Sequence, residues 1–180
     1  LPIFSARSLF DLLVEQAWKT GDPGLIFIDE MNRKYPFKDT SVLCTGSCGQ
    51  YELESFESVP YAHINLSKIL VDKGSKRMVD YDKLKFIVHV AVHFLDNCID
   101  VHKYPHPMIE ERTKRVRKIG LGVVGFADLL FRMQVSYGSK DSITLINNIM
   151  KVIQEESHVA SQILAKKRES FPAQKESTWD

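Results

Sequence analysis

Cysteine is scarce in this sequence: three of the 180 residues are cysteines, at positions 44, 48 and 98. A small, odd number of cysteines argues against a disulfide framework and favours a reducing compartment, so we expect a cytoplasmic protein. No apolar run reaches the ~20 residues of a membrane-spanning helix. Residues 1–13 also lack the basic start and long apolar core of a signal peptide. The sequence therefore predicts no membrane association.

An excess of one charge is also absent, because 24 Lys and Arg side chains are balanced by 23 Asp and Glu side chains. The resulting net charge of +1 gives no strong attraction to nucleic acid or to anionic lipid, so neither is expected as a partner. The basic run at residues 112–118 is local and is typical of a solvated helix face.

The sequence does contain enough apolar residues, 44%, for one domain with a real core over residues 1–180. Segments with apolar residues every three or four positions alternate with short apolar runs, a pattern that predicts alternating helices and strands. The expected helices lie between Ser5 and Gly21, from Asp80 or Asp82 to beyond Ile99, over residues 125–133, and onward from Ser139. The expected strands cover residues 25–28, 61–66 and 118–124. We expect a turn at 74–77, a break at Pro105 and Pro107, and loops at 33–60 and 171–180.

This order of elements predicts an α/β fold with a parallel sheet. Residues 25–28, a continuous apolar run, suit a strand that is buried on both faces. About three strands are too few for a closed barrel, so we expect one sector of a larger sheet.

A glycine motif, Gly120-Leu-Gly122-Val-Val-Gly125, follows a predicted strand and precedes a predicted helix. This G-x-G-x-x-G spacing is found in dinucleotide sites, but those also need a second strand ending in an acidic residue about 20 residues later. Asp141 instead opens a helix. The favoured interpretation is that the glycines let a buried strand turn tightly into a packed helix.

Four histidines and three cysteines are the other candidates for chemistry. His89 and His93 are four residues apart on one helix, followed by His102 and His106, but the H-E-x-x-H pattern is missing, so no metal site is predicted. Cys44 and Cys48 do not have C-x-x-C spacing. Cys48 lies in the long loop and is a candidate reactive thiol, whereas Cys98 is expected in the core.

Several spaced motifs resemble the large catalytic chain of ribonucleotide reductases, above all the adenosylcobalamin-dependent kind. The resemblance extends over nearly all of the chain. The motifs lie at residues 18–29, 45–50, 56–58, 64–66, 95–97, 104–105, 117–129, 137–139 and 171–172.

The resemblance implies part of a ten-stranded α/β barrel, built from two five-stranded halves, with a central finger loop at about residues 40–60. In the family, the loop cysteine becomes a thiyl radical that abstracts the 3′ hydrogen of a ribonucleotide. A nearby Glu takes the proton of the 3′ hydroxyl, an Asn holds the 2′ hydroxyl, and a cysteine pair supplies electrons. Cys48 occupies the thiyl position, and the resemblance assigns substrate contacts to Ser47 and Ser58.

The other family positions have changed. The family's Asn-Pro-Cys-Gly-Glu is Gly46-Ser-Cys-Gly-Gln50 here, so Gly46 has no side chain for the 2′ hydroxyl and Gln50 has no carboxylate to accept a proton. Val59 stands at the place of one reducing cysteine, and Pro60 and His63 replace an Asn and a Ser.

Two functions follow from these residues. The first is a reductase that is inactive alone and that uses adenosylcobalamin, a ribonucleotide substrate, and either a complementary chain or copies of itself. The missing phosphate-binding loop and tail cysteines would come from that partner. The second is a non-catalytic module that binds a nucleotide or another reductase chain. The sequence supports both.

Overall fold

The structure, a computed structural model, describes residues 5–74 and 76–179. The chain divides into two compact units, Leu1–Ser55 with Glu176–Trp179, and Phe56–Lys175. Among the described residues, no helix combines the length and the hydropathy that crossing a bilayer requires.

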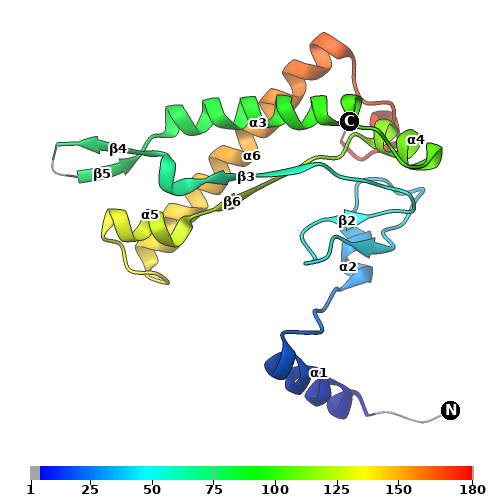
Figure 1. The fold of residues 1–180 in the computed structure, drawn as a ribbon, viewed down its shortest axis with the longest axis horizontal. Helices are drawn as coiled ribbons and strands as arrows, with labels where there is room; N and C mark the ends of the chain where they lie inside the picture. The colour runs from blue at the N-terminus through cyan, green and yellow to red at the C-terminus, as the bar shows by residue number, and fades with distance from the viewer. Residues whose placement is uncertain (1–4, 75, 180) are drawn as a thin grey trace. The chain divides into compact units, whose positions relative to one another are not determined.

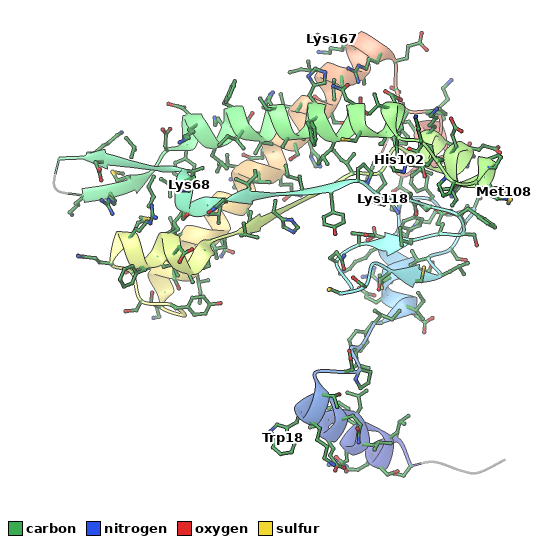
Figure 2. All side chains as sticks on the ribbon, viewed as in Figure 1. Trp18, Lys68, His102, Met108, Lys118 and Lys167 are labelled. Atoms are coloured by element: carbon green, nitrogen blue, oxygen red, sulfur yellow. The ribbon has the colours of Figure 1, made fainter. Side chains whose placement is uncertain are left out.

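Helix α1 (Ala6–Thr20) opens the first unit and lies where the sequence predicted it. Gly21 ends the helix in the left-handed region at φ 84°, and its N–H donates to the carbonyl oxygen of Ala17 at 2.9 Å. All fifteen residues of α1 are described, and none of them is buried. Trp18 extends away from the helix (Figure 2). The apolar side of α1 therefore adds nothing to the core of this unit.

The predicted strand at residues 25–28 is wrong. Residues 22–27 are irregular, and Ile28 begins helix α2 (Ile28–Lys34). Leu25 is 55% exposed and Phe27 is 74% exposed. A strand needs a hydrogen-bonded neighbour, and no strand within residues 5–74 or 76–179 pairs with this run. The apolar run consequently stays in solvent.

The core of the first unit forms after α2, around the buried side chains of Tyr35, Phe37 and Val42. Phe37 makes an antiparallel bridge to Ser177, which ties the end of the chain to this unit. Two short antiparallel strands, β1 (Cys44–Thr45) and β2 (Glu52–Leu53), form a hairpin next to this core.

A parallel strand pair is the centre of the second unit. Strands β3 (Tyr61–Asn65) and β6 (Gly120–Val124) run side by side (Figure 1), with Tyr61 opposite Gly120 and His63 opposite Gly122. This confirms the strands predicted at 61–66 and 118–124. One face of the pair contributes to the hydrophobic core, and on the other face β3 presents the exposed residues Tyr61, His63 and Asn65. The core side chains of the pair are Ile64, Leu121 and Val123.

Three helices cover the core face, as the apolar spacing predicted: α3 (Tyr81–Val101), α5 (Phe126–Met133) and α6 (Lys140–Arg168). Asp80 caps α3 by accepting the N–H of Lys83 at 2.9 Å, and Ser139 caps α6 by accepting the N–H of Ser142 at 3.2 Å. Helix α3 crosses α6 (Figure 1). Their buried contact residues include Leu84, Val88, Val92, Ile149 and Ile153.

Local structure differs from expectation elsewhere as well. Strands β4 (Leu70–Lys73) and β5 (Lys76–Val79) form a hairpin where only a turn was predicted. Pro107 begins helix α4 (Pro107–Val116) instead of only breaking the chain, because proline is tolerated in the first helical turn. Short 3₁₀ turns occupy Leu66–Lys68 (η1) and Gln174–Glu176 (η2), the second inside the predicted terminal loop.

The basic run at residues 112–118 is not a solvated helix face, because none of its residues is fully exposed. Arg117, at the end of α4, donates to Asp96 at 2.9 Å and to Asp100 at 2.7 Å on α3. The hydrogen bond to Asp100 is the largest cause that raises the pKa of Arg117 above its ordinary value, and the bond to Asp96 adds to it. Lys118 pairs with Glu57 (Figure 2 labels Lys118). The run therefore fastens the start of β6 to its neighbours.

Candidate active site

The candidate thiol lies in the loop that joins β1 to β2. Gly46 donates its N–H to the carbonyl oxygen of Tyr51 at 3.0 Å, and Gly49 donates to that of Gly46 at 2.9 Å. Gly49 is in the left-handed region at φ 72°, which glycine adopts without strain. Backbone hydrogen bonds therefore define the path of the residues on either side of Cys48.

Cys48 is exposed and is not in a disulfide. Its Sγ lies 3.7 Å from the Oγ of Ser47, which is also exposed. The structure thus brings together the predicted thiyl position and one predicted substrate contact. A small thiol at an exposed turn is accessible to a ligand.

Gln50 folds back over the loop. Its Oε1 accepts the N–H of Cys48 at 2.8 Å. A Cβ at Gly46 would lie 2.8 Å from Nε2 of Gln50 and 2.7 Å from Cζ of Tyr51, closer than such contacts normally come. The two departures from the family motif are therefore linked, since the Gln50 amide fills the space that a side chain at position 46 would need.

Polar contacts with side chains of the first unit hold both ends of the β1–β2 hairpin. The Oδ1 of Asn32 accepts the N–H of Val42 at 2.7 Å, just before β1. The carboxylate of Glu54, just after β2, accepts the hydroxyls of Tyr35 at 2.5 Å and Thr40 at 2.8 Å. Both ends of the hairpin are thereby anchored in the core of the first unit. The sequence did not reveal these contacts, because each joins residues ten or more positions apart.

Ser58, the other predicted substrate contact, belongs to the second unit. Its N–H donates to Oγ1 of the buried Thr113 at 3.2 Å. The neighbouring Glu57 has a fully buried side chain whose carboxylate lies 2.9 Å from Nζ of Lys118. Val59, at the position of a family cysteine, is buried. These contacts fix the chain where it enters β3.

The glycine motif has the packing role that the sequence favoured. Gly120 and Gly122 lie in β6, and Gly125 precedes α5 at φ 72°. A Cβ at Gly125 would come within 2.5 Å of Oδ1 of Asn65. The close approach of β3 and the turn into the helix both require glycine.

The histidines on α3 and beyond it do not gather. His89 bonds Glu156 at 2.9 Å, His93 contacts Arg168 at 3.0 Å, and His106 caps α4 by accepting the N–H of Met108. His102 packs edge-on against Tyr104. In the described parts of the chain, no group of three His, Cys, Asp or Glu side chains is arranged to hold a metal ion. Cys98 is half-buried.

Comparisons with known proteins all match members of one family. The profile of the ribonucleotide reductase barrel domain matches residues 3–180. The vitamin B12-dependent ribonucleoside-diphosphate reductase of Thermoplasma acidophilum is 46% identical over 176 residues, 97% of this chain and 22% of that protein. The Mycobacterium tuberculosis protein of the same name is 41% identical over 169 residues, 93% of this chain and 24% of that protein.

A solved structure is similar as well. The class Id ribonucleotide reductase alpha subunit of Actinobacillus ureae superposes with a TM-score of 0.78 at 26% identity, covering 94% of this chain and 33% of that chain. The chain spans less than a quarter of the length of the two vitamin B12-dependent relatives.

Proposed function

The chain belongs to the ribonucleotide reductase family and forms part of its α/β barrel, and on this premise we propose that it carries the radical cysteine, Cys48, of a reductase. The observation that supports this role most directly is the loop geometry. Cys48 is exposed at the end of a hairpin whose two strands are anchored below it. Reduction of ribonucleotides by such an enzyme would supply deoxyribonucleotides for DNA synthesis.

The residues around Cys48 limit the reaction. A thiyl radical at Cys48 would abstract the 3′ hydrogen of the ribose, and the 3′ hydroxyl must then lose its proton. Gln50 is an amide and already accepts the N–H of Cys48, so it is a poor proton acceptor. Gly46 offers nothing to the 2′ hydroxyl, while Ser47 and Ser58 are the proposed polar contacts to substrate. We therefore expect the chain to be inactive alone.

The proposed partner is a complementary reductase chain that supplies the rest of the barrel, or, in a homo-oligomer, a second copy of this chain. We use the term assembled reductase for this chain together with whatever completes the barrel. Adenosylcobalamin is the proposed cofactor, because two relatives are named vitamin B12-dependent. Among the described residues, no group of three His, Cys, Asp or Glu side chains is placed to hold a metal ion, so any contact with this cofactor is left to other groups. The free cysteines favour a cytoplasmic location.

A second function is favoured by the linked changes at Gly46 and Gln50. Because the Gln50 amide fills the space beside Gly46, the loop is closed on itself and suits a module that binds nucleotides or other reductase chains without chemistry. The first function requires the Cys48 thiol for the reaction, and the second does not.

The test is Gln50→Glu in the assembled reductase, purified through a tag on this chain. We expect ribonucleotide reduction to rise at least tenfold, because a positioned general base contributes about two to four powers of ten. Cys48→Ser should abolish the activity of both forms. If Gln50→Glu brings no gain and Cys48→Ser no loss while both variants remain folded, the non-catalytic function holds.

A further inference from the structure

Tyr51 closes the loop that carries Cys48. It directly follows the motif at residues 45–50, and strand β2 begins at the next residue. Its carbonyl oxygen accepts the N–H of Gly46 at 3.0 Å, which joins the two ends of the loop. Tyr51, Gly46 and Cys48 all belong to the first unit, so their placement relative to one another is part of one compact body.

The ring of Tyr51 lies against the bare backbone of Gly46. A Cβ at Gly46 would come within 2.7 Å of Cζ, the ring carbon to which the hydroxyl is bonded. The end of the ring that carries the hydroxyl is therefore the part of Tyr51 that enters this space. Gly46 is buried and Tyr51 is half-buried, so part of the tyrosine remains accessible to a ligand.

A hydroxyl at this place can stand in for a polar side chain at position 46. The polar atoms of an asparagine there would lie two bonds beyond its Cβ. The hydroxyl oxygen of Tyr51 lies one bond beyond Cζ, which is itself 2.7 Å from that Cβ position. The two polar groups therefore fall in the same small region beside the Cys48 turn. Both donate and accept hydrogen bonds, so the phenol supplies the kind of group that Gly46 lacks.

The amide of Gln50 reaches the same space but suits the role less well. Its Nε2 would lie 2.8 Å from a Cβ at Gly46. Its Oε1 is held by the N–H of Cys48 at 2.8 Å, which fixes the acceptor side of the amide within the loop. Nε2 is a donor only, whereas the hydroxyl of Tyr51 is both a donor and an acceptor.

We propose that Tyr51 is a substrate-contact residue of the assembled reductase, whose hydroxyl hydrogen-bonds the 2′ hydroxyl of the ribonucleotide bound at Cys48. This inference rests on the proposed function, in which Gly46 offers nothing to that hydroxyl. The contact breaks no covalent bond and transfers no electron. A 2′-deoxyribonucleotide has no hydroxyl at this place, so the contact favours the substrate over its reduced product.

The test is the affinity of the assembled reductase for a ribonucleoside diphosphate, divided by its affinity for the matching 2′-deoxyribonucleoside diphosphate, both measured by calorimetry. Tyr51→Phe removes only the hydroxyl, and we expect it to lower this ratio about fivefold, through the loss of one hydrogen bond. Tyr137→Phe, at an exposed tyrosine of the second unit, is the matched control and should leave the ratio unchanged. A ratio that Tyr51→Phe leaves unchanged would overturn the proposal.

A pair of substitutions tests whether the two positions share one place. Tyr51→Ala should lower the ratio as Tyr51→Phe does. Gly46→Asn added to Tyr51→Ala should restore it, because the amide can then enter the space that the ring has left. Circular dichroism shows whether each variant is folded. A folded double variant that binds like Tyr51→Ala alone would overturn the proposal.

The ratio is a binding measurement, so it is independent of turnover, whereas Cys48→Ser tests the reduction itself. A ratio that depends on Tyr51 without any Cys48-dependent reduction would remove the reductase function and leave Tyr51 as the ribose contact of a nucleotide-binding module. An assembled reductase that binds neither nucleotide would overturn the proposed function and the Tyr51 contact together.

Discussion

The side chains of Gln50 and Tyr51 crowd the space beside Gly46 in the loop between β1 and β2. The amide of Gln50 and the ring of Tyr51 occupy the volume that a side chain at Gly46 would need. The sequence predicted that both family positions had changed, but not that the changes depend on each other. That dependence follows from the fold of the loop, in which Gln50 turns back to the N–H of Cys48.

Gly46→Asn should consequently destabilise the first unit. We expect a loss of about 1–3 kcal/mol in the free energy of unfolding, because overpacking forces the ring and the amide to move. Gly49→Asn is the matched control. The space around Gly49 is open and its left-handed backbone is one that asparagine tolerates, so its cost should be well below that of Gly46→Asn. Urea unfolding of the two variants measures the difference, and equal costs would contradict the crowding seen at position 46.

At the scale of elements, capping signals were the most reliable guide. Ser139 and Asp80, the latter one of two predicted candidates, cap their helices, because capping depends on neighbours in sequence. Ser5 precedes α1 as predicted but makes no side-chain cap hydrogen bond. The run at 25–28 failed for the opposite reason, since strand formation depends on a neighbour that the sequence does not show. Cys48 could be singled out because its motif, residues 45–50, is local, whereas the pairing of β3 with β6 joins residues about sixty positions apart.

Helices α3 and α6 are joined by a pH-dependent polar contact of Glu156 with His89 and Lys85, called the clasp below. Glu156 on α6 accepts hydrogen bonds from His89 and lies 3.3 Å from Nζ of Lys85, both on α3. The hydrogen bond from His89, and then that from Lys85, hold the pKa of Glu156 below its ordinary value of 4.5. A carboxyl group with a lowered folded-state pKa stabilises the fold above its unfolded pKa, and this contribution is lost as the pH falls through the folded value.

Glu156→Gln should therefore lower the melting temperature at pH 7 and lower it less at pH 3. Thermal unfolding followed by circular dichroism at both pH values measures this change. Glu155→Gln, next to it on the same helix, is the control, because its carboxylate is exposed and lies 3.9 Å from Lys151. An equal effect of Glu156→Gln at the two pH values would show that the clasp does not titrate as described.

At the scale of the whole molecule, segments of the two units differ in how well buried side chains anchor their backbone. The segment from α1 through residue 27 buries little, whereas helix α5 is fixed by the buried Leu129 and Leu130. Exposure of single side chains does not reveal this difference, since Phe131 on α5 is 85% exposed and Phe27 only 74%.

Limited chymotrypsin digestion of the isolated chain should cut after Phe27 before it cuts after Phe131. Cleavage requires the backbone to leave its local structure, which costs little in an irregular segment and more in an anchored helix. Mass spectrometry of the first fragments identifies the site. A first cut at Phe131 would show that residues 22–27 are better anchored than their exposure indicates.

The parallel pairing of β3 with β6 can form only after β6 has been synthesised. The two strands are roughly sixty residues apart in the chain, with α3, α4 and the β4–β5 hairpin between them. At about 5–20 residues per second, β3 leaves the ribosome some seconds before its partner exists. During that interval its hydrogen-bonding edge is open, and Tyr61, His63 and Asn65 stand in solvent with no β6 beside them. Newly made chain is thus most exposed to trapping by chaperones, or by other nascent chains, before residue 124 has emerged.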